Sequence, residues 1–98
     1  MTKPLVLRAA AEADIEDAFH WYEAQDPGLG VEFLRAVEAS LGSIEREPEL
    51  YAAIYKRARR VLLRRFPYAL YFVIQPLTID VVGCFHMRRH PRRWRSRL

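Results

Sequence analysis

The longest apolar run of this 98-residue chain is Tyr68–Ile74, with the sequence YALYFVI. Both of its alternating sets of positions are apolar, and it is rich in aromatic and β-branched residues that favour strands. Successive side chains of a strand point to opposite faces. Such a strand therefore exposes apolar side chains to water unless both of its faces are covered. The stretch therefore predicts a central strand with other parts of the chain packed on both sides.

Two further segments around this stretch have the composition of strands. Residues 60–63 precede it and residues 78–85 follow it, while the central strand itself is expected over residues 68–75. Proline-containing breaks separate the three segments, Phe66-Pro67 before the central strand and Pro76-Leu77 after it. Short breaks of this kind favour an antiparallel three-stranded meander.

The first half of the chain has a helical period instead. Apolar residues recur at i, i+3, i+4 and i+7 within residues 11–25, and a similar stripe runs through residues 29–46. Asp26-Pro27-Gly28 separates the two segments and Pro48 ends the second, which predicts an antiparallel helical hairpin. With a short strand at Leu5-Val6-Leu7, the predicted order is β-α-α-β-β-β, a single α+β domain over residues 1–98.

The charge is divided unequally along the chain. The net charge is +4, but residues 1–50 hold four Lys/Arg against eleven Asp/Glu, and residues 51–98 hold twelve Lys/Arg against Asp80 alone. The two halves therefore carry −7 and +11, so the second half is suited to an anionic partner, either nucleic acid or an acidic protein surface.

Several classes of protein are not expected. The longest apolar run is far below the length of about 20 residues that spans a bilayer, and no signal-peptide pattern is evident at the N-terminus. The single cysteine, Cys84, excludes an internal disulfide, and the three histidines lack the spacing of metal ligands. We therefore expect a cytoplasmic protein with no membrane partner, no metal and no cofactor, in which Cys84 is buried.

Three local patterns, in this order, resemble one family. Residues 60–72 (RVLLRRFPYALYF) look like a basic strand, a Phe-Pro-Tyr turn and an aromatic strand, and residues 86–91 (HMRRHP) precede Trp94. The acidic first helix contains Trp21-Tyr22 near its end. Together they resemble the RelE/ParE superfamily of toxins from bacterial type II toxin–antitoxin systems, which stabilise plasmids. The resemblance implies a small toxin that a cognate antitoxin neutralises by wrapping around it in a hetero-oligomer.

The family divides by target, and the sequence favours one branch. A RelE-like toxin, which cleaves mRNA in the ribosome, needs an acid–base pair and cations around the phosphate. No Glu follows Glu49 and no Tyr follows Tyr71, so the family's usual carboxylate and tyrosine are missing. We therefore favour a ParE-like inhibitor that binds DNA gyrase, with the mRNA endonuclease as the alternative and a non-toxic antitoxin binder as a third. The candidates for a nuclease site are His86, Arg60, Arg64 and Arg89.

Residues expected to bind a partner lie in the basic half of the chain. His86 could equally form a hydrogen bond at a strand end, and the arginines could be a solvated sheet edge. Trp94, in the basic tail of residues 87–98, requires an apolar protein surface or a nucleic-acid base on which to stack. The expected binding residues are Arg57, Arg60, Arg64, Arg65, Arg88, Arg89 and Trp94.

Overall fold

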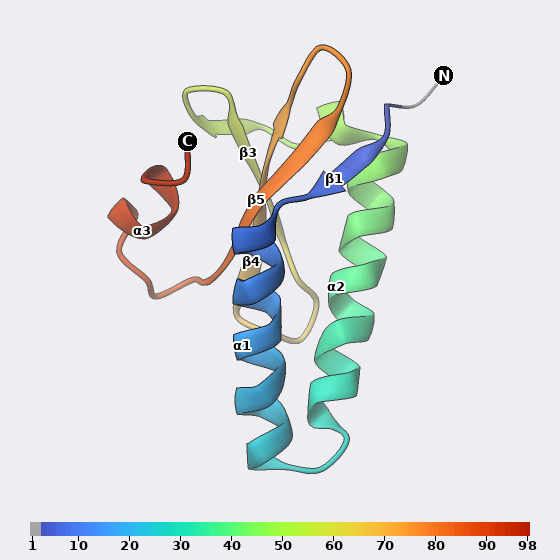
Figure 1. Ribbon diagram of the computed structural model, residues 1–98, viewed down its shortest axis with the longest axis vertical. Helices are drawn as coiled ribbons and strands as arrows, with labels where there is room; N and C mark the ends of the chain where they lie inside the picture. Colours follow the sequence, from blue (N-terminus) through green and yellow to red (C-terminus); the bar gives the residue numbers. More distant parts are fainter. Residues whose placement is uncertain (1–2) are drawn as a thin grey trace.

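The computed structural model describes residues 3–98 and confirms the predicted α+β order (Figure 1). Strand β1 (Leu5–Leu7) leads into helices α1 (Ala9–Gln25) and α2 (Leu29–Arg46). The short 3-10 helix η1 (Pro48–Leu50) then leads to the strands β2 (Ala53–Tyr55), β3 (Ala58–Leu62), β4 (Tyr68–Ile74) and β5 (Ile79–His86), and to helix α3 (Arg92–Arg95). Within residues 3–98, no helix combines the length and the apolar character that crossing a membrane requires.

The strands form one mixed five-stranded sheet in the order β1-β5-β4-β3-β2, with β4 at its centre as predicted. The pairs β3–β4 and β4–β5 are antiparallel and form the predicted meander. Strand β1 lies parallel to β5, because the helical hairpin carries the chain across one face of the sheet. Strand β2 was not predicted from the sequence.

The turn between α1 and α2 falls at the predicted Asp26-Pro27-Gly28. Gly28 has a φ of 93°, a conformation that glycine adopts without steric cost. The Glu23 carboxylate accepts hydrogen bonds from the backbone N–H groups of Gly28 and Gly30, at 3.0 Å each. These bonds satisfy donors at the start of α2 and connect it to the last turns of α1.

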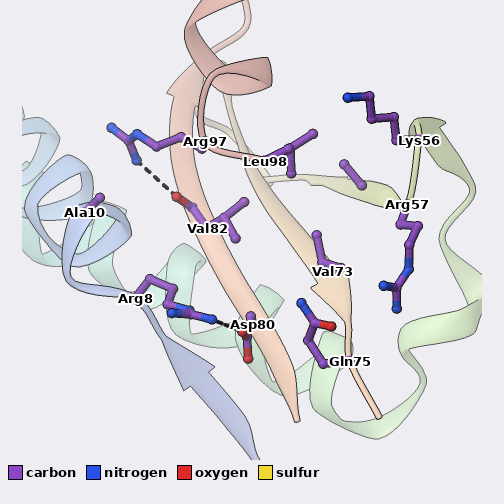
Figure 2. Close-up of a pocket in the computed structure, with 11 residues that line it drawn as sticks. Arg8, Ala10, Lys56, Arg57, Val73, Gln75, Asp80, Val82, Arg97 and Leu98 are labelled. Carbon is purple, nitrogen blue, oxygen red and sulfur yellow. Dashed lines mark hydrogen bonds and ion pairs between the residues drawn. The ribbon is translucent and has the colours of Figure 1, made fainter. Parts of the chain in front are cut away.

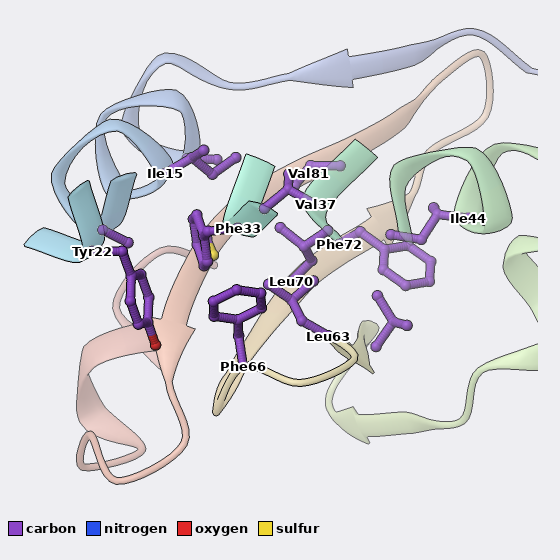
Figure 3. Packing of buried hydrophobic residues seen from close by; sticks show 14 of the residues in the cluster. Ile15, Tyr22, Phe33, Val37, Ile44, Leu63, Phe66, Leu70, Phe72 and Val81 are labelled. Atoms are coloured by element: carbon purple, nitrogen blue, oxygen red, sulfur yellow. The ribbon is translucent and has the colours of Figure 1, made fainter. Parts of the chain in front are cut away.

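The two faces of the sheet bury separate apolar clusters, which confirms the pattern of β4. Leu70 and Phe72 point toward the helical hairpin, where they pack with Phe33 of α2 in the main core (Figure 3). Ala69 and Tyr71 point to the opposite face and pack in a second, smaller cluster. Both alternating faces of the central strand are thus covered.

The second cluster is closed by the basic tail. Trp94 of α3 is only 7% exposed, and its indole stacks on Tyr71 with ring centroids 5.0 Å apart. Phe85 of β5 belongs to the same cluster. Trp94 was expected to stack on an apolar surface or on a nucleic-acid base, and in the structure it packs on an apolar surface of the protein.

Candidate functional site: two cationic hollows beside the tail

The residues expected to bind a partner do not form one surface. Arg64 and Arg65 lie in the turn after β3 and line a groove between α2 and the sheet, where Arg65 is 3.6 Å from Glu32. Arg60 pairs with Tyr71 in the β3–β4 register and therefore shares the face that Trp94 covers. The remaining arginines, Arg57, Arg88 and Arg89, lie in or next to two hollows on either side of the tail.

The first hollow, which we call the sheet groove, lies on the face of the sheet opposite the helical hairpin. It has a volume of about 490 Å³, and Val73 and Val82 lie in its floor (Figure 2). Figure 2 shows cationic side chains on its two sides, Lys56 and Arg57 on one and Arg8 and Arg97 on the other. An apolar floor between cations suits a ligand that carries both apolar and acidic groups.

Two cations of the sheet groove are held in place by neighbouring groups. Arg8 forms an ion pair with the buried Asp80, whose other oxygen accepts a hydrogen bond from the Thr78 hydroxyl at 2.7 Å. The hydrogen bonds from Thr78 and Arg8 hold the pKa of Asp80 below its usual range. Arg57 donates to the backbone carbonyl of Ile74 at 2.6 Å. The Arg8–Asp80 pair could not be inferred from the sequence, because its members are 72 residues apart.

The second hollow, which we call the His86 cleft, lies between α1 and the end of β5. It has a volume of about 400 Å³. Helix α1 contributes Trp21, the strands contribute Tyr68 and His86, and the segment after β5 contributes Arg89 and Arg93. An adjoining pocket is lined by Trp21, Tyr68, His86 and Arg89 again, so these four side chains surround one connected recess.

His86 is engaged by the backbone. Its Nδ1 atom accepts a hydrogen bond from the Arg88 N–H at 3.0 Å, and its ring lies edge-on to Tyr68. His90 repeats this bond with the Arg92 N–H at 3.1 Å. An Nδ1 atom that accepts a hydrogen bond places the proton of the neutral ring on Nε2. In this arrangement the Nε2–H group of the neutral His86 ring can donate a hydrogen bond, but Nε2 has no free lone pair with which to act as a base.

Two further groups of the cleft, the Tyr68 hydroxyl and the Cys84 thiol, are neutral. Burial raises the pKa of the Tyr68 hydroxyl, which therefore stays protonated at neutral pH. Burial, together with the neighbouring Asp14 carboxylate, raises the pKa of the Cys84 thiol to about 12. The prediction of a buried Cys84 is confirmed. No group of three potential metal ligands occurs in the described part of the chain.

Two comparisons relate this chain to proteins already characterised. Its residues 5–91 match the family described as the ParE toxin of type II toxin–antitoxin systems, parDE. A solved structure titled as the chromosomal ParDE TA system from P. aeruginosa contains a chain of similar fold, with a TM-score of 0.76 and 15% sequence identity. The similarity covers 86% of this chain and 95% of that one. None of the curated proteins compared with the sequence matches it.

Proposed function

Because the chain belongs to the ParE toxin family of type II toxin–antitoxin systems, we propose that it inhibits DNA gyrase by binding to it and is neutralised by a cognate antitoxin. The antitoxin is proposed to place an acidic segment in the sheet groove. The family match, which extends over nearly the whole chain, is the observation that carries this proposal. A cytoplasmic location follows from such a target.

The geometry of His86 supports binding rather than RNA cleavage. A nuclease of the RelE type needs a base for the 2′-hydroxyl, and the bond from the Arg88 N–H leaves His86 without a free lone pair at Nε2. Of the two carboxylates that line the cleft, Asp14 is engaged by Arg97 at 2.9 Å and Asp17 lies exposed on α1. The engagement of His86 and Asp14 favours a surface that binds an anion without using these two groups as an acid–base pair.

The sheet groove has the charge that an acidic antitoxin segment needs. Lys56 and Arg57 project from the β2–β3 turn, and both side chains are exposed. Lys56 has a φ of 52°, a strained conformation for a residue with a side chain, and such strain is often found at binding sites. Apolar residues of the segment would cover Val82, and its carboxylates would lie against these cations.

Supercoiling by purified gyrase tests the target. Relaxed plasmid, gyrase and ATP are incubated with increasing amounts of the protein, and parallel translation reactions are examined by primer extension on the mRNA. We expect loss of supercoiling and intact mRNA. Unaffected supercoiling together with codon-phased mRNA cuts would overturn the gyrase assignment in favour of the endonuclease.

Charge reversal in the sheet groove tests the antitoxin's position. The antitoxin is obtained as the product of the small frame adjacent to the toxin gene, and its affinity is measured by calorimetry. Lys56→Glu with Arg57→Glu should weaken the complex at least about tenfold, because like charges across an interface cost several kcal/mol. Arg35→Glu with Arg46→Glu on α2 changes the net charge equally and is the matched control. Equal effects of the two pairs would place the acidic segment elsewhere.

A further inference from the structure

We propose that the His86 cleft is a binding site for a short single-stranded nucleic acid, with a base stacked on Trp21 and phosphates held by Arg89 and Arg93. The site is separate from the sheet groove, and the proposal does not depend on the gyrase or antitoxin assignments. It requires binding only and involves no bond cleavage.

Trp21 is the observation from which the proposal starts. It is 57% exposed, although large aromatic side chains are usually buried where packing allows it. Its neighbour Tyr22 is buried in the main core, so the helix period itself directs Trp21 away from the core. An exposed indole at the mouth of a recess provides a flat surface on which any base can stack.

Arginines lie next to this surface. Arg89 lines both the cleft and the adjoining pocket together with Trp21, and Arg93 lines the cleft. Arg88 and Arg92 are exposed on the same short segment. Among residues 3–98, none of these four arginines forms an ion pair with a carboxylate. Their guanidinium groups are therefore available for phosphate oxygens, which they can bind with two parallel hydrogen bonds.

The segment that carries these arginines is fixed on the protein. Trp94 is buried between Arg93 and Arg95, and Arg97 is bound to α1 and β5. The backbone N–H groups of Arg88 and Arg92 are held by the two histidine rings. A fixed row of cations loses less conformational entropy on binding than a flexible tail does, which favours affinity.

Two carboxylates in the cleft limit where a phosphate can lie. Asp14 is neutralised by its two bonds to Arg97. Asp17 is exposed on α1 and has no cation within ion-pair distance in the described part of the molecule. Phosphates are therefore expected on the side of Arg89 and Arg93, and removal of the Asp17 charge should strengthen binding.

The same features favour nucleic acid over an acidic peptide. A peptide in a groove gains most of its affinity from apolar side chains in apolar pockets. The His86 cleft instead combines one exposed indole with polar rings, Tyr68 and His86, and with several arginines. Base stacking and phosphate binding use all of these groups, whereas carboxylates would use only the arginines.

Fluorescence anisotropy with the purified protein tests the proposal. The probes are labelled oligo-dT and oligo-U of about 10 nucleotides, in the range of known single-strand site sizes, together with a duplex and poly-glutamate as competitors. We expect saturable binding of both single strands. Their relative affinities show whether the cleft prefers DNA or RNA. Trp21→Ala should weaken binding about 5- to 100-fold, the usual effect of losing one stacked base, whereas Trp21→Phe should lose less. Asp17→Asn should strengthen it.

The dependence on salt gives a second readout. Each phosphate contact that is lost should reduce the slope of log K against log salt by about 0.7 for a single strand. Arg89→Ala and Arg93→Ala should each show this reduction. Arg35→Ala with Arg46→Ala on α2 removes two charges outside the cleft and should leave the slope unchanged. All variants are compared after their folding has been checked by thermal melting.

Tryptophan emission separates stacking from simple charge attraction. A base stacked on Trp21 should quench its emission, while the buried Trp94 should keep its emission in the Trp21→Phe variant. Three results would overturn the proposal: no saturable binding at low salt, affinity that is insensitive to Trp21→Ala, or competition by poly-glutamate as strong as that by oligo-dT. The last two would indicate a general attraction for polyanions.

Discussion

Asp14 in α1 and Arg97 in the tail, 83 residues apart in sequence, form a two-pronged ion pair. The Nη1 and Nη2 atoms of Arg97 donate to Oδ2 and Oδ1 of Asp14 at 2.9 and 3.0 Å. Both side chains are largely shielded from water: the exposed fraction is 27% for Arg97 and 16% for Asp14. The pair ties the end of the tail to the helical hairpin across the edge of the sheet.

The same two residues satisfy backbone groups at an irregularity in the sheet. The β4–β5 register shifts between Tyr71 and Phe72, and Val82 is left without a partner in the ladder. Arg97 donates to the carbonyl of Val82 at 3.0 Å, and Asp14 accepts from the N–H of Cys84 at 3.0 Å. The ion pair thus satisfies the carbonyl of the bulged Val82 and the N–H of Cys84, which lies beyond the residues of β5 that pair with β1.

Removal of this pair should loosen the tail. Arg97→Ala and Asp14→Asn are each expected to destabilise the fold by about 2–3 kcal/mol, as for other hydrogen bonds to charged groups. Urea unfolding followed by tryptophan emission measures the loss. The double variant should lose much less than the sum of the two, because both changes remove one interaction. The control is Arg92→Ala, which changes an exposed arginine of the same tail, and an equal effect of this variant would contradict the assignment.

The two tryptophans should differ strongly in their effect on stability. Trp94→Ala empties a buried position against Tyr71 and should cost about 3 kcal/mol or more. Trp21→Ala removes an exposed side chain and should change the free energy of unfolding by about 0.5 kcal/mol or less. Denaturant titrations of both variants give the comparison. Similar losses for the two would mean that Trp21 is packed in solution.

His86→Ala should leave toxicity intact. Loss of the hydrogen bond to the Arg88 N–H is expected to cost about 1 kcal/mol of stability, but a protein that acts by binding gyrase needs no proton transfer. Growth arrest on induced expression is the readout. His90→Ala removes the equivalent bond to Arg92 and controls for the change in stability. Loss of toxicity in His86→Ala alone, with folding retained, would support the endonuclease.

Stability should fall in acid partly through Asp80. Its pKa in the folded state is lowered, so the carboxylate contributes stability above the pKa of the unfolded chain, about 3.9. That contribution is lost as the pH falls through the lower folded value. In Asp80→Asn the slope of stability against pH below about pH 4 should be shallower than in the wild type. Parallel slopes measured by urea unfolding between pH 2 and pH 6 would show that another group is responsible.

Cys84 should be unreactive in the folded protein. Burial raises its pKa to about 12, so the reactive thiolate is almost absent at neutral pH. Labelling by a thiol reagent such as DTNB should be slow in buffer and fast in denaturant. Because Asp14 binds the Cys84 N–H, Arg97→Ala should accelerate the labelling through looser packing. Fast labelling of the native wild type would contradict the buried position.

The strands and helices could be predicted because their signals are local. Each of these signals can be recognised within a short stretch of the sequence. They are the seven consecutive apolar residues of β4, the apolar stripes of the helices and the Asp26-Pro27-Gly28 turn. The family resemblance likewise rested on short strings in a fixed order. Strand β2 was not predicted, although it is as long as the predicted strand β1.

The arrangement of the binding residues could not be predicted in the same way. The sequence placed Trp94 beside exposed arginines, yet the fold buries it on Tyr71 and leaves Trp21 as the exposed indole. Arg8 and Arg97 were not expected to bind a partner, but both line the sheet groove.

The α+β order, the central strand and the division of charge into an acidic first half and a basic second half follow from the amino-acid sequence alone. The ion pairs Arg8–Asp80 and Asp14–Arg97 depend on the packed fold, because their members are separated by 72 and 83 residues. Hydrophobic periods are set by neighbouring positions, whereas an ion pair depends on where the packed sheet and helices bring distant side chains together.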